Sequence, residues 1–153
     1  MSYKFLNHTA DLKVFVKEKN MNTAFFNSAL ALREAICGKI KIKPKIKKNI
    51  SVKGRDLESL FYNFLEEFLF LLDAKGFLLS NVKKIKIREF GKGSRASIKS
   101  SAFNNKKLVL TAEVLGDKVG NYKFSNNVKA ITYNDMFIGK KGKSFICQFV
   151  LDV

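Results

Sequence analysis

The longest amphipathic pattern in the chain begins at Asp56 and ends at Gly76. Asp56 is a typical N-cap, and Gly76 is a typical residue at which a helix ends. Between them, the apolar residues recur at intervals of three and four and share one broad face: Leu57, Leu60, Phe61, Phe64, Leu65, Phe68, Leu69 and Leu72. Because so wide a face must be buried, we expect this helix to pack against a sheet.

The remaining segments predict one further helix and several strands. A second helical pattern lies between Asn22, a suitable N-cap, and Gly38. Alternating or continuous apolar residues predict strands in these segments: Tyr3–Leu6, Leu12–Lys17, 40–53, Val82–Phe90, Lys107–Leu115, Val128–Ile138 and Ser144–Val153. The last of them is apolar on both faces, so we expect it at the centre of a sheet.

These elements do not alternate strictly as strand, helix and strand, and they show no internal repeat. They predict an α+β fold: a single compact two-layer domain with two main helices and a mixed or antiparallel sheet of about six or seven strands. At 153 residues the chain has the usual size of one domain, which we expect to cover residues 1–153. Fifteen Phe and no Trp predict that Phe fills much of the core.

The chain is strongly basic, with a formal net charge of +16 at pH 7. Such a field attracts polyanions, including RNA, DNA and acidic membrane surfaces. A Lys-rich surface without any role in nucleic-acid binding is the alternative. Most of the basic residues are Lys, whereas Arg is the better side chain for bidentate recognition of phosphates and bases.

Lysines alternate with apolar residues in the segment 40–53, at positions 41, 43, 45 and 47. Pro44 confines this segment to a sheet edge or a break. The lysines protect an edge strand from aggregation, or they follow a phosphate backbone. We favour the edge strand, because no exposed aromatic residue is interleaved with these lysines as a stacking surface requires.

The two cysteines, Cys37 and Cys147, have no zinc-site spacing and lie among apolar neighbours, which is typical of small buried hydrophobes. The N-terminal segment lacks the apolar run of a signal peptide. The most apolar stretch is interrupted by Glu66 and Glu67 and is too short to span a membrane. We therefore expect a cytoplasmic protein without a membrane partner.

Candidate catalytic motifs fail on their context. Gly139–Gly142 matches the GxxG loop of a KH domain, but strands rather than helices are expected on both sides, so we expect a hairpin turn. Gly142-Lys143-Ser144 resembles the end of a P-loop, but Phe137 replaces the required first glycine. A catalytic triad would depend on the single histidine, His8, and no serine lies in a nucleophile elbow. We expect no catalytic residue and no enzyme.

Carboxylates are scarce in this basic chain, so their placement is informative. Asp11 follows the polar cluster His8-Thr9-Ala10, and Asp152 is followed only by Val153. A central last strand that ends beside the turn of an early strand could gather several oxygen ligands. Oxygen-only ligation suits calcium, magnesium or manganese. The alternatives are that the terminal Asp152 is simply solvated and that His8-Thr9-Ala10-Asp11 is a turn that happens to be polar.

Four segments, in order from one end of the chain to the other, resemble the archease family. They are the His-Thr-Ala-Asp turn with the strand and helix that follow, the Asp-headed helix DLESLFYNFLEEFLFLLD, the strand VKAITYNDMFI and the ending FVLDV. Two positions depart from the family pattern: Asn134 stands where the family tends to have histidine, and Glu66 where it tends to have asparagine.

This resemblance implies a non-catalytic activator of the GTP- and metal-dependent RNA ligase of tRNA splicing. That ligase joins 2′,3′-cyclic-phosphate or 3′-phosphate ends to 5′-hydroxyl ends, and archeases promote its guanylylation and its multiple turnover. The resemblance also implies a chaperone-like role toward a tRNA methyltransferase as an alternative, and contact with tRNA through the ligase complex.

The resemblance also implies the residues of the site. The metal ligands would be Asp11, Asp152 and the backbone carbonyl or terminal carboxylate of Val153. Calcium is the ion expected in a crystal, and manganese or magnesium is expected to act in the cell. Lys129 would belong to the ligase-activation surface, and His8 would support Asp11 by hydrogen bonding.

Overall fold

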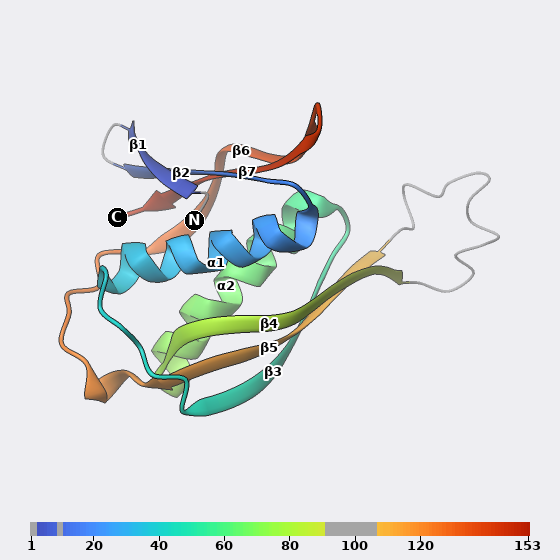
Figure 1. The fold of residues 1–153 in the computed structure, drawn as a ribbon. Helices are drawn as coiled ribbons and strands as arrows, with labels where there is room; N and C mark the ends of the chain where they lie inside the picture. The colour runs from blue at the N-terminus through green and yellow to red at the C-terminus, as the bar shows by residue number, and fades with distance from the viewer. Residues whose placement is uncertain (1–2, 9–10, 91–106) are drawn as a thin grey trace.

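The computed structural model describes residues 3–8, 11–90 and 107–153 (Figure 1). The elements in this part of the chain are β1 (Tyr3–His8), β2 (Asp11–Glu18), α1 (Met21–Cys37), β3 (Ile46–Gly54), α2 (Leu57–Lys75), β4 (Phe77–Phe90), β5 (Lys107–Lys118), a 3-10 helix (Val119–Asn121), β6 (Ala130–Lys141) and β7 (Ser144–Asp152). These two α-helices and seven strands confirm the predicted α+β class. None of the described helices is long and apolar enough to cross a membrane.

The strands form two antiparallel sheets where the sequence led us to expect one. Sheet A has the strand order β1-β2-β7-β6, and sheet B has the order β3-β5-β4. Both helices lie between the sheets, so the domain has three layers instead of the two expected (Figure 1). The physical reason lies in α1, where nearly every residue from Ala24 to Leu32 is buried. A helix that is buried on all sides needs cover from two faces.

Local capping fixes the helix ends. The Asp56 carboxylate accepts a hydrogen bond from the Ser59 N–H at 2.8 Å and completes a capping box, and Gly76 ends α2 in the left-handed region, as predicted. The N-cap of α1 is Asn20 rather than Asn22, because the Asn20 side chain accepts the Thr23 N–H at 2.9 Å. Asn22 instead donates its side-chain amide to the Ile85 carbonyl on β4 at 3.0 Å.

Phenylalanine rings connect the helices to sheet A. The Phe61 ring on α2 lies 5.1 Å from the Phe25 ring on α1 and 5.2 Å from the Phe149 ring on β7, both in edge-to-face geometry. The strand β7 lies between β2 and β6 and buries most of its residues, which confirms the predicted central strand. Cys37 and Cys147 are buried and free, as expected.

The lysine-rich segment 40–53 becomes a strand only from Ile46, after Pro44. The strand β3 lies at the edge of sheet B, which confirms the edge-strand interpretation for this part of the segment. Two hydrogen bonds from residues outside the segment hold the backbone that precedes this strand. The Lys43 N–H donates to the Tyr122 hydroxyl at 2.9 Å, and the Ser80 hydroxyl donates to the Ile42 carbonyl at 2.7 Å.

Candidate functional site

One end of sheet A gathers the residues that the sequence predicted as a site. Asp11 begins β2, Asp152 ends β7, and the two are direct register partners. Ala130, at the start of β6, lies opposite Asp152 on the other side, and His8, at the end of β1, pairs with Asp11. One row across four strands therefore holds these residues, and we call it the acidic row. Thr9 and Ala10 lie outside the described residues.

Lys129 is fixed to the acidic row by its backbone. Its N–H donates to the carbonyl oxygen of Asp152 at 2.7 Å. The preceding residue, Val128, is buried, and its own N–H donates to the Asn126 side chain at 2.9 Å. The Lys129 side chain is nevertheless exposed. Its position is therefore set by the chain on both sides while its ammonium remains accessible to a partner.

The two carboxylates of the acidic row favour a cation. Directly opposed residues on antiparallel strands have Cβ atoms about 4.5–5.5 Å apart, and like charges in such a pair destabilise a sheet. Asp11 and Asp152 are both partly buried, and Val153, which follows directly, is 39% exposed. Carboxylate and main-chain oxygens are the ligands that calcium, magnesium and manganese prefer. The residues therefore fit a hard divalent cation.

Side chains alone do not complete a metal site. Within the described part of the chain, no three or more His, Cys, Asp or Glu residues are grouped so that they could hold an ion. A third protein ligand beside Asp11 and Asp152 would come from an oxygen of Val153, as the sequence analysis expected.

A bulge in β6 lies on the same sheet, beyond the acidic row. The register between β6 and β7 is interrupted between Thr132 and Phe137, and Asp135 has a positive φ of 54°. The Gln148 side chain donates to the Asp135 carbonyl at 2.8 Å, and the Lys13 ammonium lies 3.5 Å from the Asp135 carboxylate. Asn134 lies exposed on this bulge.

Sequence reasoning missed the bulge and its partners. A non-glycine residue in the left-handed region carries no reliable sequence signal. The neighbouring Tyr133 ring stacks on the Tyr62 ring of α2 with centroids 4.5 Å apart, which fixes the start of the bulge. One signal was available in the sequence. The predicted strand 128–138 is longer than the stretch over which its apolar residues alternate.

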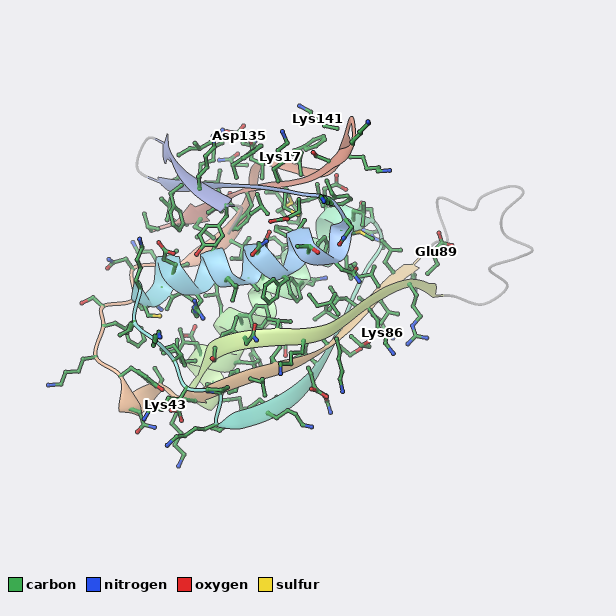
Figure 2. All side chains as sticks on the ribbon, in the orientation of Figure 1. Lys17, Lys43, Lys86, Glu89, Asp135 and Lys141 are labelled. Atoms are coloured by element: carbon green, nitrogen blue, oxygen red, sulfur yellow. The ribbon has the colours of Figure 1, made fainter. Side chains whose placement is uncertain are left out.

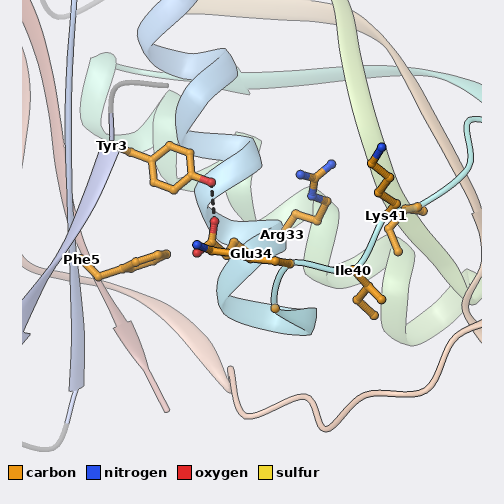
Figure 3. Close-up of a pocket in the computed structure, with 9 residues that line it drawn as sticks. Tyr3, Phe5, Arg33, Glu34, Ile40 and Lys41 are labelled. Carbon is orange, nitrogen blue, oxygen red and sulfur yellow. Dashed lines mark hydrogen bonds between the residues drawn. The ribbon is translucent and has the colours of Figure 1, made fainter.

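A separate pocket of about 710 Å³ lies between β1 and the C-terminal end of α1 (Figure 3). The Tyr3 hydroxyl donates to the Glu34 carboxylate at 2.7 Å across it, and burial together with Glu34 raises the pKa of Tyr3 to about 12. The Arg33 guanidinium donates to the Ser80 carbonyl at 2.6 Å. Among the side chains that the structure describes, no predicted site residue lines this pocket, and Tyr3 lies at the opposite end of β1 from His8. It is therefore distinct from the acidic row.

Comparisons with known proteins identify the family of the chain. The model of the archease protein family (MTH1598/TM1083) matches residues 3–153. Protein archease of Pyrococcus furiosus is 35% identical, with 99% of this chain and 98% of that protein covered. Protein archease of Sulfurisphaera tokodaii is 31% identical, with the same coverage of both chains.

A solved structure shares the fold. The solution structure of Methanobacterium thermoautotrophicum protein 1598 has a TM-score of 0.73, at 22% identity and with 99% of each chain covered. The match of the family model over residues 3–153 and the relatives of more than 30% identity lead to one conclusion. The chain belongs to the archease family.

Proposed function

We propose that this protein is a non-catalytic accessory factor of a GTP- and metal-dependent RNA ligase of the tRNA-splicing type, and that it promotes the guanylylation of that ligase. The observation that carries the proposal is the acidic row, where Asp11 and Asp152 are register partners and Lys129 is bonded through its backbone to Asp152. These are the residues that the family resemblance implies for metal binding and activation.

The acidic row suits a positioning role. Asp11 and Asp152 are register partners on adjacent strands, and the backbone of Lys129 is bonded to Asp152 just before β6, so the three residues start from fixed backbone positions, as orienting reactants requires. A divalent cation held by Asp11, Asp152 and an oxygen of Val153 would attract a phosphate oxygen. Lys129 would orient a nucleotide phosphate or a partner carboxylate. In this account the chemistry belongs to the ligase, and this chain adjusts the geometry in which GTP reacts.

The charge of the chain supports encounter with such a partner. A net charge of +16 draws the protein toward an RNA-loaded, negatively charged complex, and salt screens that attraction. Stimulation should therefore weaken as ionic strength rises. The same charge favours the second candidate function, a basic RNA-binding protein that acts without the ligase, and that function would show steeply salt-dependent RNA affinity by itself.

The test adds this protein, below the molar amount of the ligase, to a ligation reaction with GTP, metal and cleaved tRNA. We expect more ligation turnovers with the wild type and no ligation by this protein alone. Asp11→Ala, Asp152→Ala and Lys129→Ala should lose the stimulation while circular dichroism shows an intact fold. If wild-type protein leaves the turnover of the ligase unchanged, the result contradicts ligase activation and favours the RNA-binding alternative.

A further inference from the structure

One face of sheet A is not covered by any described helix (Figure 1). Side chains of β7 alternate between the two faces: Phe145, Cys147, Phe149 and Leu151 belong to the main core, whereas Ile146 and Val150 do not. Ile146 and Val150 are nevertheless 5% and 0% exposed. The side chains of neighbouring strands must therefore cover them on the outer side of the sheet.

Two aromatic rings lie in that outer layer. Phe15 on β2 and Phe137 on β6 are both register partners of Gln148, so they flank it on adjacent strands of the same face. Strands lie about 4.8 Å apart, which places the two backbones about 10 Å from each other. Phe137 is 36% exposed, and Phe15 is partly exposed. We call Phe15, Gln148 and Phe137 the aromatic row.

Each ring of the aromatic row is covered by an ammonium group. The Lys4 Nζ lies 5.6 Å from the centroid of Phe15, and the Lys141 Nζ lies 5.1 Å from the centroid of Phe137. Lys17 lies two residues from Phe15 on the same face of β2. Figure 2 shows Lys17, Asp135 and Lys141 together on this outer side of the molecule. Rings and cations are therefore interleaved on this face, whereas the segment 40–53 has lysines without aromatic residues.

We propose that the outer face of sheet A binds a single-stranded nucleic acid, with bases stacked on Phe15 and Phe137 and with the lysines on its phosphates. Every base has a π-face, so stacking on exposed aromatic residues holds a strand without reading its sequence. The ring faces now lie against ammonium groups through cation–π contact. On binding, a base takes the place of each ammonium, and Lys4 and Lys141 move to phosphate oxygens.

The position of the aromatic row relative to the acidic row sets the path of the bound nucleic acid. Asp11 and Phe15 lie four residues apart on the same face of β2, which is about 13 Å. The positive residues Lys13 and Lys17 lie on either side of Phe15, and the carboxylates lie beyond Lys13. A nucleic acid whose bases stack on both rings would therefore run across the β-strands, parallel to the acidic row and about 13 Å from it. This inference does not depend on ligase activation.

The test uses a 12-nucleotide oligouridine with 2-aminopurine at a central position, and a DNA strand of the same design, without any ligase. Since the chain contains no Trp, the fluorescence of 2-aminopurine can be followed against a low protein background. We expect the signal to be quenched on binding. Phe15→Leu and Phe137→Leu keep an apolar side chain at each position but remove the ring, and each should weaken binding about fivefold or more.

The matched control is Phe70→Leu, because Phe70 is 50% exposed on α2, away from this face. It should bind as the wild type does. Lys4→Ala and Lys141→Ala, which leave both rings in place, should lower the salt dependence of binding. Wild-type affinity in both phenylalanine variants and both lysine variants would overturn the inference. So would a loss of binding confined to Lys84→Glu and Lys86→Glu on sheet B.

Discussion

The outer faces of the two sheets carry similar charges but differ in what accompanies them. On sheet B, Glu113 of the middle strand lies 3.3 Å from the Lys84 ammonium and 3.8 Å from the Lys47 ammonium, beside a shallow cleft of about 340 Å³. The described residues that line the cleft include no aromatic side chain. On sheet A, lysines lie over two phenylalanine rings, and two carboxylates meet at one end.

This difference separates general attraction from recognition. A field of lysines draws polyanions to either sheet, but charge alone does not hold a base or order a phosphate. Sheet A adds groups that interact in a defined geometry: ring faces, a pair of opposed carboxylates and a lysine whose backbone is fixed. Both proposals therefore place the specific functions on sheet A and leave general electrostatic attraction to sheet B.

The largest expected effect concerns the helical layer that lies between the two sheets. Phe61 contacts Phe25 on α1 and Phe149 on β7, so Phe61→Ala should leave a cavity and lower the free energy of unfolding by about 3–5 kcal/mol. Urea denaturation followed by circular dichroism measures this loss. Phe70→Ala, the exposed control, should change the free energy of unfolding by less than about 0.5 kcal/mol. Two separate unfolding transitions in the wild type would contradict a shared core.

The second prediction concerns the acidic row. With calcium or manganese at 100 times the dissociation constant, the free energy of unfolding of the wild type should rise by about 2.7 kcal/mol relative to a chelator. Asp152→Asn removes one of the two carboxylates and should lose most of this gain. In chelator alone, the same variant should be more stable than the wild type by about 0.2–1 kcal/mol, because the like-charge pair is gone. Thermal unfolding measures both. Equal metal responses in both proteins would rule out the site.

The third prediction addresses the bulge next to the aromatic row. Gln148→Ala removes the 2.8 Å hydrogen bond to the Asp135 carbonyl and should lower the free energy of unfolding by about 0.5–1.5 kcal/mol. The amides of Asn134 to Met136 should exchange with solvent faster, while those of sheet B keep their rates. Hydrogen exchange by NMR distinguishes this local loosening from a general loss of stability, which would argue against a role for Gln148 in fixing the bulge.

The smallest effect is expected on sheet B. Lys84 is 70% exposed, and its ion pair with Glu113 should contribute less than about 1 kcal/mol to the free energy of unfolding. Lys84→Ala should leave both ligase stimulation and base stacking near wild-type values. A loss of ligase stimulation in this variant would move a specific function to sheet B and erase the contrast between the two faces.

The sequence predicted best the elements whose signals are local. The ends of α2 follow from Asp56 and Gly76, whose capping chemistry is encoded within a few residues. The central position of β7 follows from its two apolar faces. The division into two sheets was not predictable, because a half-buried strand has the same alternation in either sheet. In the structure, the division shows in α1, which is buried on all sides because a sheet covers each of its two faces.

The residues of the candidate site were predicted, but the register that pairs them was not. Asp11 and Asp152 came from the scarcity of carboxylates together with the family resemblance, and Lys129 came from the resemblance. The structure places all three at one end of sheet A. Their register depends on how strands from opposite ends of the chain pair, which no local pattern encodes. Phe15 and Phe137 were counted as ordinary strand residues, since sequence alternation does not tell which face of a sheet a helix covers.

The most direct test of the central claim isolates guanylyl transfer from the rest of ligation. The ligase is incubated with radiolabelled GTP and metal, without RNA, together with the wild-type protein, Asp152→Asn or Asp73→Asn. Asp73 is an exposed carboxylate on α2, so its variant makes the same change of charge away from the acidic row. We predict that wild type and Asp73→Asn accelerate labelling of the ligase, and that Asp152→Asn does not. Equal acceleration by all three proteins would contradict the assignment of activation to the acidic row.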